Sequence, residues 1–206
     1  MKQDLIDTVP DMAVSRETEA RLDAFLTLLL RWNARINLVA SNDPAVLRQR
    51  HIADSLQLLP LLPEGDGPMA DLGSGGGFPG LVLAAAVTRP VHLVESDRRK
   101  SAFLQAAAAE LGLSHVTVHA ERIEAVTLPP IAVLTARALA PLEKMLPWAE
   151  RLLAPDGVAI FPKGRNAAAE LEAAQPGWTM AVQRFKSMTD PDATILKLSG
   201  LRRVGA

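Results

Sequence analysis

The sequence predicts an α/β protein with a doubly wound, mostly parallel sheet, an antiparallel hairpin at one edge and a helical cap at its N-terminal end. From residue 69 onward, short unbroken apolar runs alternate with helical stretches, as in buried parallel strands joined by helices. The last two apolar runs have no helix between them, which predicts the hairpin. Before residue 63, apolar side chains recur at helical spacing instead.

The helical cap is predicted over residues 1–66. A first helix is indicated by apolar residues three or four positions apart, at Leu22, Phe25, Leu26, Leu29 and Ile36. Ser41 or Asn42 offers an N-cap for a second helix, which bears Val46, Leu47, Ile52, Leu56 and Leu59. The turn-rich stretch 63–68 separates this cap from residues 67–206, and we expect the two parts to form one compact unit.

The remaining elements follow in order along residues 67–206. Strands are predicted at residues 69–72, 91–95, 116–119, 131–135, 158–162, 178–185 and 194–198. Helices are predicted at residues 80–87, 98–111, 142–153 and 167–174. Gly112 ends the second of these helices, and Asp156-Gly157 is expected to form a turn into the fifth strand.

Composition excludes several classes of protein and site. The chain has 206 residues, 49% of them hydrophobic, which is enough for a packed core. Its net charge of −1 argues against binding nucleic acid through bulk positive charge. Without cysteine it has no disulfide, thiolate metal site or cysteine nucleophile. Residues 1–4 do not resemble a signal peptide and the leucine run 28–30 is too short to span a bilayer, so we expect a cytoplasmic protein.

The strongest functional signal is a glycine-rich loop after the first predicted strand, Asp71-Leu72-Gly73-Ser74-Gly75-Gly76-Gly77-Phe78-Pro79-Gly80. Glycines allow positive φ and close approach of a ligand, and the helix that follows presents free N–H groups. The spacing Gly75-x-Gly77-x-x-Gly80 fits a dinucleotide site, with Glu95 as acceptor for the ribose hydroxyls. A structural turn without a ligand is the remaining interpretation.

Asp71 favours a different ligand from a dinucleotide. A carboxylate aimed into this site would repel a pyrophosphate, but it suits the ammonium group of S-adenosylmethionine, which has no phosphate. The frame Asp71-x-Gly73-x-Gly75-x-Gly77 is the acidic-Gly-x-Gly-x-Gly pattern of Rossmann-like methyltransferases. Glu95 serves either cofactor. We therefore expect S-adenosylmethionine as the cofactor.

Further motifs extend this pattern over most of the chain. They are Arg31-Trp32-Asn33, Ile36-Asn37-Leu38, Arg50-His51-Ile52-Ala53-Asp54-Ser55-Leu56, Phe78-Pro79-Gly80, Arg137-Ala138 before Pro141-Leu142, and Pro162-Lys163-Gly164. Together the motifs resemble the bacterial 16S ribosomal RNA guanine-N7 methyltransferases of the glucose-inhibited-division-protein-B type, or methyltransferase G of the small subunit. The resemblance runs from residue 31 to about residue 198. Thr135-Ala136 departs from the family, which more often has a serine beside the arginine.

The resemblance implies a Rossmann-like methyltransferase that transfers a methyl group from S-adenosylmethionine to guanine N7 in 16S ribosomal RNA of the small ribosomal subunit. It implies cofactor contacts in addition to Asp71, Gly75, Gly77 and Glu95 of the glycine frame, and these are Gly73, Phe78, Ile123, Glu124 and Arg137. Phe78 and Ile123 are expected to flank the adenine. Arg137 follows the fourth strand, at the end of the sheet where ligands bind.

Guanine N7 carries a free lone pair, so no proton has to leave before it attacks the sulfonium methyl group. We therefore expect direct in-line transfer that depends on positioning and on exclusion of water, without a general base. Arg137, Lys163 and His51 are the candidates for positioning. No metal site is expected, because the four histidines lack ligand spacing.

Several residues allow a structural and a functional interpretation. For His51 and Asp54, one helical turn apart, we favour a buried hydrogen-bonded pair that locks the cap to the glycine loop over a catalytic pair. Asn33 and Asn37 are expected on the first helix. For both, we favour capping or bridging of the second helix of the cap over contact with RNA. For Trp32, we favour a position in the core over stacking on an RNA base.

An RNA substrate requires local positive charge. Residues 31–51 carry Arg31, Arg35, Arg48 and Arg50 against a single aspartate, and Arg98-Arg99-Lys100 and Lys163 with Arg165 form two more clusters. We expect 16S ribosomal RNA or the small subunit as the partner, no membrane, and a monomer. Two alternatives stay open: a methyltransferase for a small molecule, with the cap as a lid, and a module that binds the cofactor without catalysis.

Overall fold

A computed structural model describes residues 7–9 and 13–205, so residues 1–4 of the sequence analysis lie outside it. The strands are β1 (Asp7–Thr8), β2 (Met69–Leu72), β3 (Val91–Val94), β4 (Val116–His119), β5 (Ile131–Thr135), β6 (Leu153–Lys163), β7 (Trp178–Lys186) and β8 (Thr194–Arg203). The helices are α1 (Arg16–Asn33), α2 (Pro44–Leu47), α3 (Asp54–Leu56), α4 (Gly80–Ala84), α5 (Arg98–Glu110), α6 (Leu142–Leu152) and α7 (Ala167–Ala174). A π-helical segment (Arg48–Ala53) joins α2 to α3.

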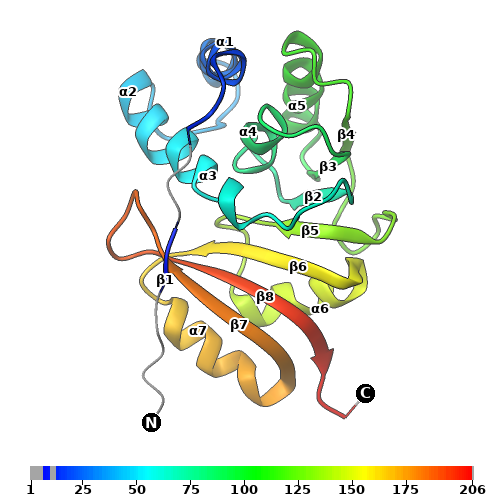
Figure 1. Ribbon diagram of the computed structural model, residues 1–206. Helices are drawn as coiled ribbons and strands as arrows, with labels where there is room; N and C mark the ends of the chain where they lie inside the picture. The colour runs from blue at the N-terminus through cyan, green and yellow to red at the C-terminus, as the bar shows by residue number, and fades with distance from the viewer. Residues whose placement is uncertain (1–6, 10–12, 206) are drawn as a thin grey trace.

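The strands form one sheet in the order β1-β7-β8-β6-β5-β2-β3-β4 (Figure 1). From β6 to β4 neighbouring strands are parallel, and β8 is antiparallel to both β6 and β7. The predicted parallel sheet with an antiparallel hairpin is therefore confirmed. The hairpin is not the outermost element, because β1 pairs with β7 beyond it. A strand of two residues is too short to show a periodic pattern in the sequence.

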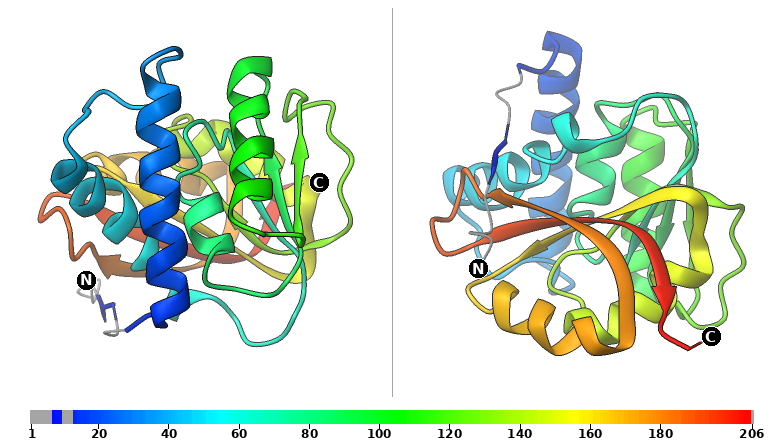
Figure 2. Two further views of the ribbon diagram at one scale, coloured as in Figure 1. Left: turned by 90° about the horizontal axis from the view of Figure 1, so that it is seen from above. Right: turned by 60° about the horizontal axis from the view of Figure 1, so that its bottom comes forward.

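Helices cover both faces of the sheet (Figures 1 and 2). The cap, α4 and α5 lie on one face, and α6 and α7 lie on the other. Side chains alternate between these layers, so Met69 of β2 packs in the first core cluster while Ala70 and Leu72 pack in the second. All four residues of β2 are buried, as expected for a parallel strand covered on both faces, and one of them is Asp71.

The strand order reverses between β2 and β5. The chain leaves β2 toward β3 and β4, but it leaves β5 in the opposite direction toward β6. At such a switch point, the loops that follow the two central strands diverge and leave a crevice in which open α/β sheets bind ligands. The glycine loop after β2 and the segment 136–140 after β5 border this crevice.

The cap differs from its prediction in two details. Helix α1 ends at Asn33, so Ile36 and Asn37 lie beyond it, because Asn33 Oδ1 accepts from the backbone N–H of Leu38 at 2.8 Å and of Val39 at 3.0 Å. Asn33 caps no helix, but its Nδ2 donates to Asn42 Oδ1 at 2.8 Å just before α2, in agreement with the bridging role within the cap. The N-cap of α2 is Asp43 rather than either predicted residue, with proline at the first helical position.

Two further predictions can be scored on local packing. The turn expected at Asp156-Gly157 lies inside β6, where a Cβ on Gly157 would come within 2.6 Å of the Ile131 carbonyl oxygen. Trp32 is partly buried against the core and packs edge-on against Phe103 at 5.7 Å, so its core role is confirmed.

Among the described helices, none is long and apolar enough to cross a membrane. The division at residue 66 stays a prediction.

Candidate active site

Two pockets lie side by side at the switch point. The smaller has a volume of about 360 Å³ and lies between the glycine loop and the ends of β3, β4 and β5. The larger, about 830 Å³, lies between the π-helical segment, the end of β6 and the loop between β7 and β8. Three residues line both pockets: Arg137, Ala138 and Leu139. Ala138 has a φ of +52°, a left-handed conformation at this shared wall.

Six of the nine predicted cofactor residues line the smaller pocket, and they are Gly73, Gly75, Glu95, Ile123, Glu124 and Arg137. Glu95 directly follows β3 and is 8% exposed. Its Oε2 accepts from the Gly75 N–H at 2.9 Å, and its Oε1 accepts from the Asp97 N–H at 2.8 Å. The carboxylate is thus fixed at the pocket wall. The two glycines adopt φ of +65° and +51°, which brings the loop backbone to the pocket.

Asp71 does not point into this pocket as the sequence analysis expects. Its side chain is fully buried, with Oδ1 accepting from Thr135 Oγ1 at 2.8 Å and Oδ2 from the Gly80 N–H at 3.3 Å. Burial raises the pKa of this carboxyl to about 6. Asp71 therefore ties the end of β2 to β5 and to the start of α4, because the glycine loop folds back over it.

Phe78 and Gly77 also lie away from the smaller pocket. Phe78 is 5% exposed, with its ring centroid 5.4 Å from that of Phe25 in α1 and 5.0 Å from that of His51. The Arg137 guanidinium lies 5.2 Å from the same ring. Phe78 therefore joins the loop to the cap and, unlike Ile123, does not line the smaller pocket. Gly77, with φ of +90°, packs close to Phe25.

Arg137 is held by the cap from several directions. Its Nη1 donates to Asp54 Oδ2 at 3.0 Å and to the Arg50 carbonyl oxygen at 3.3 Å, and its Nη2 donates to His51 Nδ1 at 3.0 Å. Burial and the positive charge of Arg137 lower the pKa of His51, so the imidazole is neutral at pH 7. His51 and Asp54 join the cap to the segment after β5 through their shared partner Arg137, and His51 also contacts Phe78 of the glycine loop directly.

Asp54 also reaches the loop between β7 and β8. Its Oδ1 accepts from Thr189 Oγ1 at 2.7 Å and from Gln57 Nε2 at 2.8 Å. Gln57 is buried, and its Oε1 accepts from the Met188 N–H at 2.8 Å. The network thus connects three separate parts of the chain around the larger pocket. The sequence analysis missed Gln57 and Thr189, because no motif contains them.

Lys163, a predicted positioning residue, lines the larger pocket with only 9% of its side chain exposed. Its Nζ donates to the Ala140 carbonyl oxygen at 2.7 Å and forms an ion pair with Glu170 Oε2 at 2.9 Å. The same Oε2 accepts from the N–H of Leu142 at 2.7 Å, at the start of α6. Glu170 was not predicted, since one glutamate on the exposed side of a short helix gives no signal.

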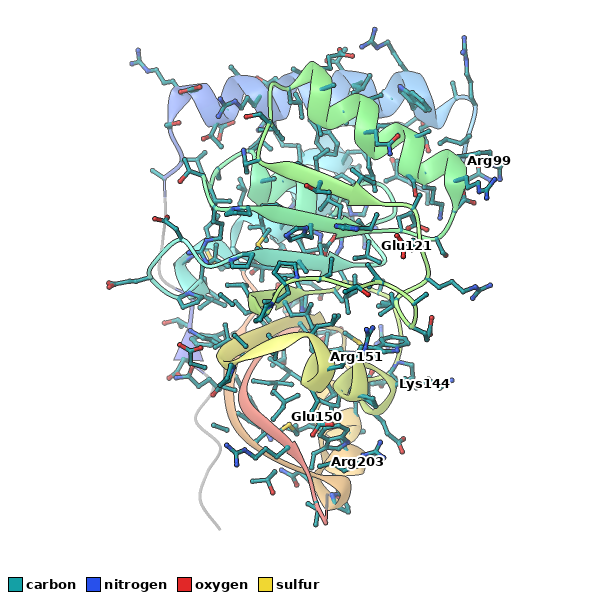
Figure 3. The ribbon with its side chains drawn as sticks, turned by 90° about the vertical axis from the view of Figure 1, so that its right-hand side faces the viewer. Arg99, Glu121, Lys144, Glu150, Arg151 and Arg203 are labelled. Carbon is teal, nitrogen blue, oxygen red and sulfur yellow. The ribbon has the colours of Figure 1, made fainter. Side chains whose placement is uncertain are left out.

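The basic clusters differ in their ion pairs and in the cavities that they line. Arg31 forms an ion pair with Glu110 at 2.7 Å, and Arg48 forms ion pairs with Glu19 and Asp23. Arg35, Arg99 and Lys100 line, together with Asp97, one cavity of about 320 Å³ between the end of α1 and the start of α5, where Arg99 Nη2 lies 3.9 Å from Asp97 Oδ2. Figure 3 shows Arg99 projecting outward from the start of α5, at the same edge of the molecule as Glu121. Arg50 lines the larger pocket.

The family model described as GidB, rRNA small subunit methyltransferase G, matches residues 18–196. The chain belongs to this family. It is 58% identical over 195 residues to the ribosomal RNA small subunit methyltransferase G of Acidiphilium cryptum, covering 92% of this chain and 88% of that protein. It is 53% identical over 191 residues to the ribosomal RNA small subunit methyltransferase G of Gluconobacter oxydans, covering 93% of this chain and 98% of that protein. The predicted resemblance to methyltransferase G is confirmed.

Solved structures agree on the fold. An O-methyltransferase from Bacillus cereus in complex with SAH has a TM-score of 0.57 and 18% identity, with 86% of this chain and 91% of that chain covered. A ribosomal protein L11 methylase from Lactobacillus delbrueckii subsp. bulgaricus has a TM-score of 0.58 and 18% identity, with 70% and 75% covered. The Rossmann-like methyltransferase fold is therefore confirmed. Membership in the methyltransferase G family also decides against a dinucleotide enzyme.

Proposed function

We propose that this member of the methyltransferase G family transfers a methyl group from S-adenosylmethionine to N7 of a guanine in 16S ribosomal RNA of the small subunit. The observation that carries the proposal is the wall shared by the two pockets. A cofactor in the smaller pocket and a base in the larger pocket would meet at residues 137–139. In-line transfer needs such a meeting point.

The smaller pocket fits the cofactor in its donor and acceptor groups. The Glu95 carboxylate, already anchored by two backbone N–H groups, would accept from the ribose hydroxyls. Ile123 offers an apolar surface for the adenine, and the backbone of Gly73 and Gly75 leaves room for the methionine part. When bound, S-adenosylmethionine supplies a methyl group activated by its sulfonium sulfur. Asp71 would act indirectly, by holding the loop in place.

The residues around the larger pocket position a base and remove no proton. In the transfer, a bond forms between guanine N7 and the methyl carbon while the carbon–sulfur bond breaks and its electron pair stays on sulfur. The proton balance is unchanged, so no general base is needed. His51 Nδ1 is occupied by Arg137, in keeping with this chemistry. Arg137, fixed by Asp54, would set the shape of the wall between cofactor and base.

The charge distribution supports a ribosomal RNA partner. The cavity lined by Arg35, Arg99 and Lys100 would contact phosphates, while Arg50 would do so at the larger pocket. Lys100 lines the cofactor pocket as well, which would place bound RNA beside the reaction. Such a substrate implies action in the cytoplasm. That the protein acts as a monomer stays a prediction.

The proposal is tested by incubating the protein with S-adenosylmethionine labelled in its methyl group. The acceptors are small subunits from cells that lack this gene, free 16S ribosomal RNA, and a panel of small molecules. We expect label in the 16S RNA of the subunits. Label in a small molecule only would contradict the proposal and favour the cap as a lid, and cofactor binding without transfer to any acceptor would favour a binding module.

A further inference from the structure

We propose that Glu170 reads the target base as guanine, by accepting hydrogen bonds from its N1–H and 2-amino groups. The inference rests on the proposed function, because it assumes that a purine enters the larger pocket. It adds a specificity-determining residue that belongs to none of the motifs of the sequence analysis.

N7 alone does not distinguish the purines, since adenine carries a lone pair there too. The difference lies on the opposite edge of the ring, where guanine presents two donors and adenine presents an acceptor at N1 with no group at C2. A carboxylate offers only acceptors. It would therefore bind guanine and repel N1 of adenine, and hydrogen bonds to a charged acceptor are the stronger kind.

Three carboxylates line the larger pocket: Asp54, Glu170 and Asp190. Both oxygens of Asp54 are engaged, by Arg137 on one side and by Gln57 and Thr189 on the other. Asp190 lies in the exposed loop between β7 and β8, where its Oδ1 accepts from a backbone N–H. Asp190 and Glu170 each have one oxygen without a donor among residues 7–9 and 13–205, but Asp190 is exposed, whereas Glu170 is partly buried and is held by an ion pair with Lys163.

The anchoring of Glu170 is strong and leaves Oε1 available. Oε2 takes both the ion pair with Lys163 and the hydrogen bond from the Leu142 N–H. Within residues 7–9 and 13–205, no group donates to Oε1, and the side chain is 26% exposed. The carboxylate is thus held in one orientation without losing its capacity to accept.

The position of Glu170 suits the far edge of the base. Lys163 Nζ contacts both the carbonyl oxygen of Ala140, which is next to the shared wall, and the carboxylate of Glu170. One ammonium group therefore separates this carboxylate from that wall. A guanine with N7 at the wall would turn its N1 edge toward Glu170. As N7 gains the methyl group, the ring becomes positively charged and N1–H becomes more acidic. Its hydrogen bond to the carboxylate then strengthens in the transition state.

The test compares guanine with hypoxanthine, which keeps N7, O6 and N1–H but lacks the 2-amino group. Small subunits are reconstituted with 16S RNA that carries one or the other base at the methylated position, and kcat/KM is measured for each. We expect the unmodified protein and the control Glu172→Gln, an exposed glutamate on the same helix, to prefer guanine by about 10-fold or more. Glu170→Gln should reduce this preference to within about 3-fold.

The preference is a ratio within each variant, so partial loss of folded protein does not affect it. An unchanged preference in Glu170→Gln, or its loss in Asp190→Asn, would overturn the proposal. If Glu170→Gln is inactive, the affinities of guanosine and inosine monophosphate for the variant loaded with S-adenosylhomocysteine give the same ratio. If even the unmodified protein methylates no subunit, the proposed function fails, while these nucleotide affinities still test Glu170.

Discussion

Arg137 Nη1 donates to Asp54 Oδ2 at 3.0 Å, and this bond joins the segment after β5 to the cap. The side chains are 18% exposed for Arg137 and 16% exposed for Asp54, so the pair is largely shielded from bulk water. Because Arg137 also lines both pockets, the bond couples the position of the cap to the wall between them.

Arg137→Lys should therefore lower kcat/KM for subunits by about 10- to 100-fold, because a single ammonium cannot serve Asp54, His51 and the Arg50 carbonyl together. Asp54→Asn should also lower kcat/KM, but by a smaller factor, because the amide oxygen can still accept a hydrogen bond from Arg137. Steady-state kinetics measure both. Activity of Arg137→Lys equal to that of the unmodified protein would contradict the positioning role.

His51 provides a test of base-free transfer. In His51→Asn, the amide oxygen replaces Nδ1 as the acceptor for Arg137, so we expect activity within about 10-fold of the unmodified protein. His51→Leu removes the acceptor and should lower activity further. Single-turnover rates with saturating cofactor measure methyl transfer in both variants. Complete loss of transfer in His51→Asn, with a normal melting temperature, would show that the imidazole itself takes part in the reaction.

Asp71 predicts a pH dependence of stability. Burial raises its pKa in the folded protein to about 6, so between about pH 4 and pH 6 the folded state binds more protons than the unfolded chain. The free energy of unfolding contributed by this group therefore falls as pH rises through that window. The amide in Asp71→Asn does not titrate. Between pH 4 and pH 7, the free energy of unfolding of this variant should therefore rise relative to that of the unmodified protein, by up to about 3 kcal/mol. Urea unfolding at several pH values measures this, and a difference independent of pH would refute the assignment.

Arg35 and Arg99, which line the cavity at the start of α5, should differ from Arg31 in RNA binding, because the contact of Arg99 with Asp97 is long, at 3.9 Å, whereas Arg31 lies 2.7 Å from Glu110. Arg35→Ala and Arg99→Ala should each reduce the slope of log affinity against log salt concentration by about 1, because each removes a phosphate contact. Arg31→Ala is the matched control, since Arg31 is paired with Glu110. Filter binding of small subunits over a range of salt concentrations measures the slopes. Equal slopes for the three variants would place the RNA elsewhere.

Much of the fold could be predicted because the central strands are short, mostly apolar runs bounded by turn residues. The bounds of β2, β4 and β5 are those predicted from the sequence. The glycine frame likewise predicted a loop beside a pocket after the first central strand, and the smaller pocket lies there.

The partners of individual side chains could not be predicted in the same way. Asp71 lies in a strand that is buried on both faces, so its sequence position does not tell whether it faces a ligand or Thr135. Thr189 and Glu170 reach the site from a loop and a helix far along the chain, and only the folded packing brings them to Asp54 and Lys163.

The central claim is transfer to guanine N7 of 16S ribosomal RNA, and chain cleavage at 7-methylguanine tests it most directly. Small subunits from cells lacking this gene are treated with the protein and S-adenosylmethionine, and their RNA is then cleaved chemically at 7-methylguanine. The account predicts one new cleavage position in 16S RNA that is absent without the cofactor. Incorporation of methyl groups without a new cleavage position would contradict it, because the methyl group would then reside on another atom.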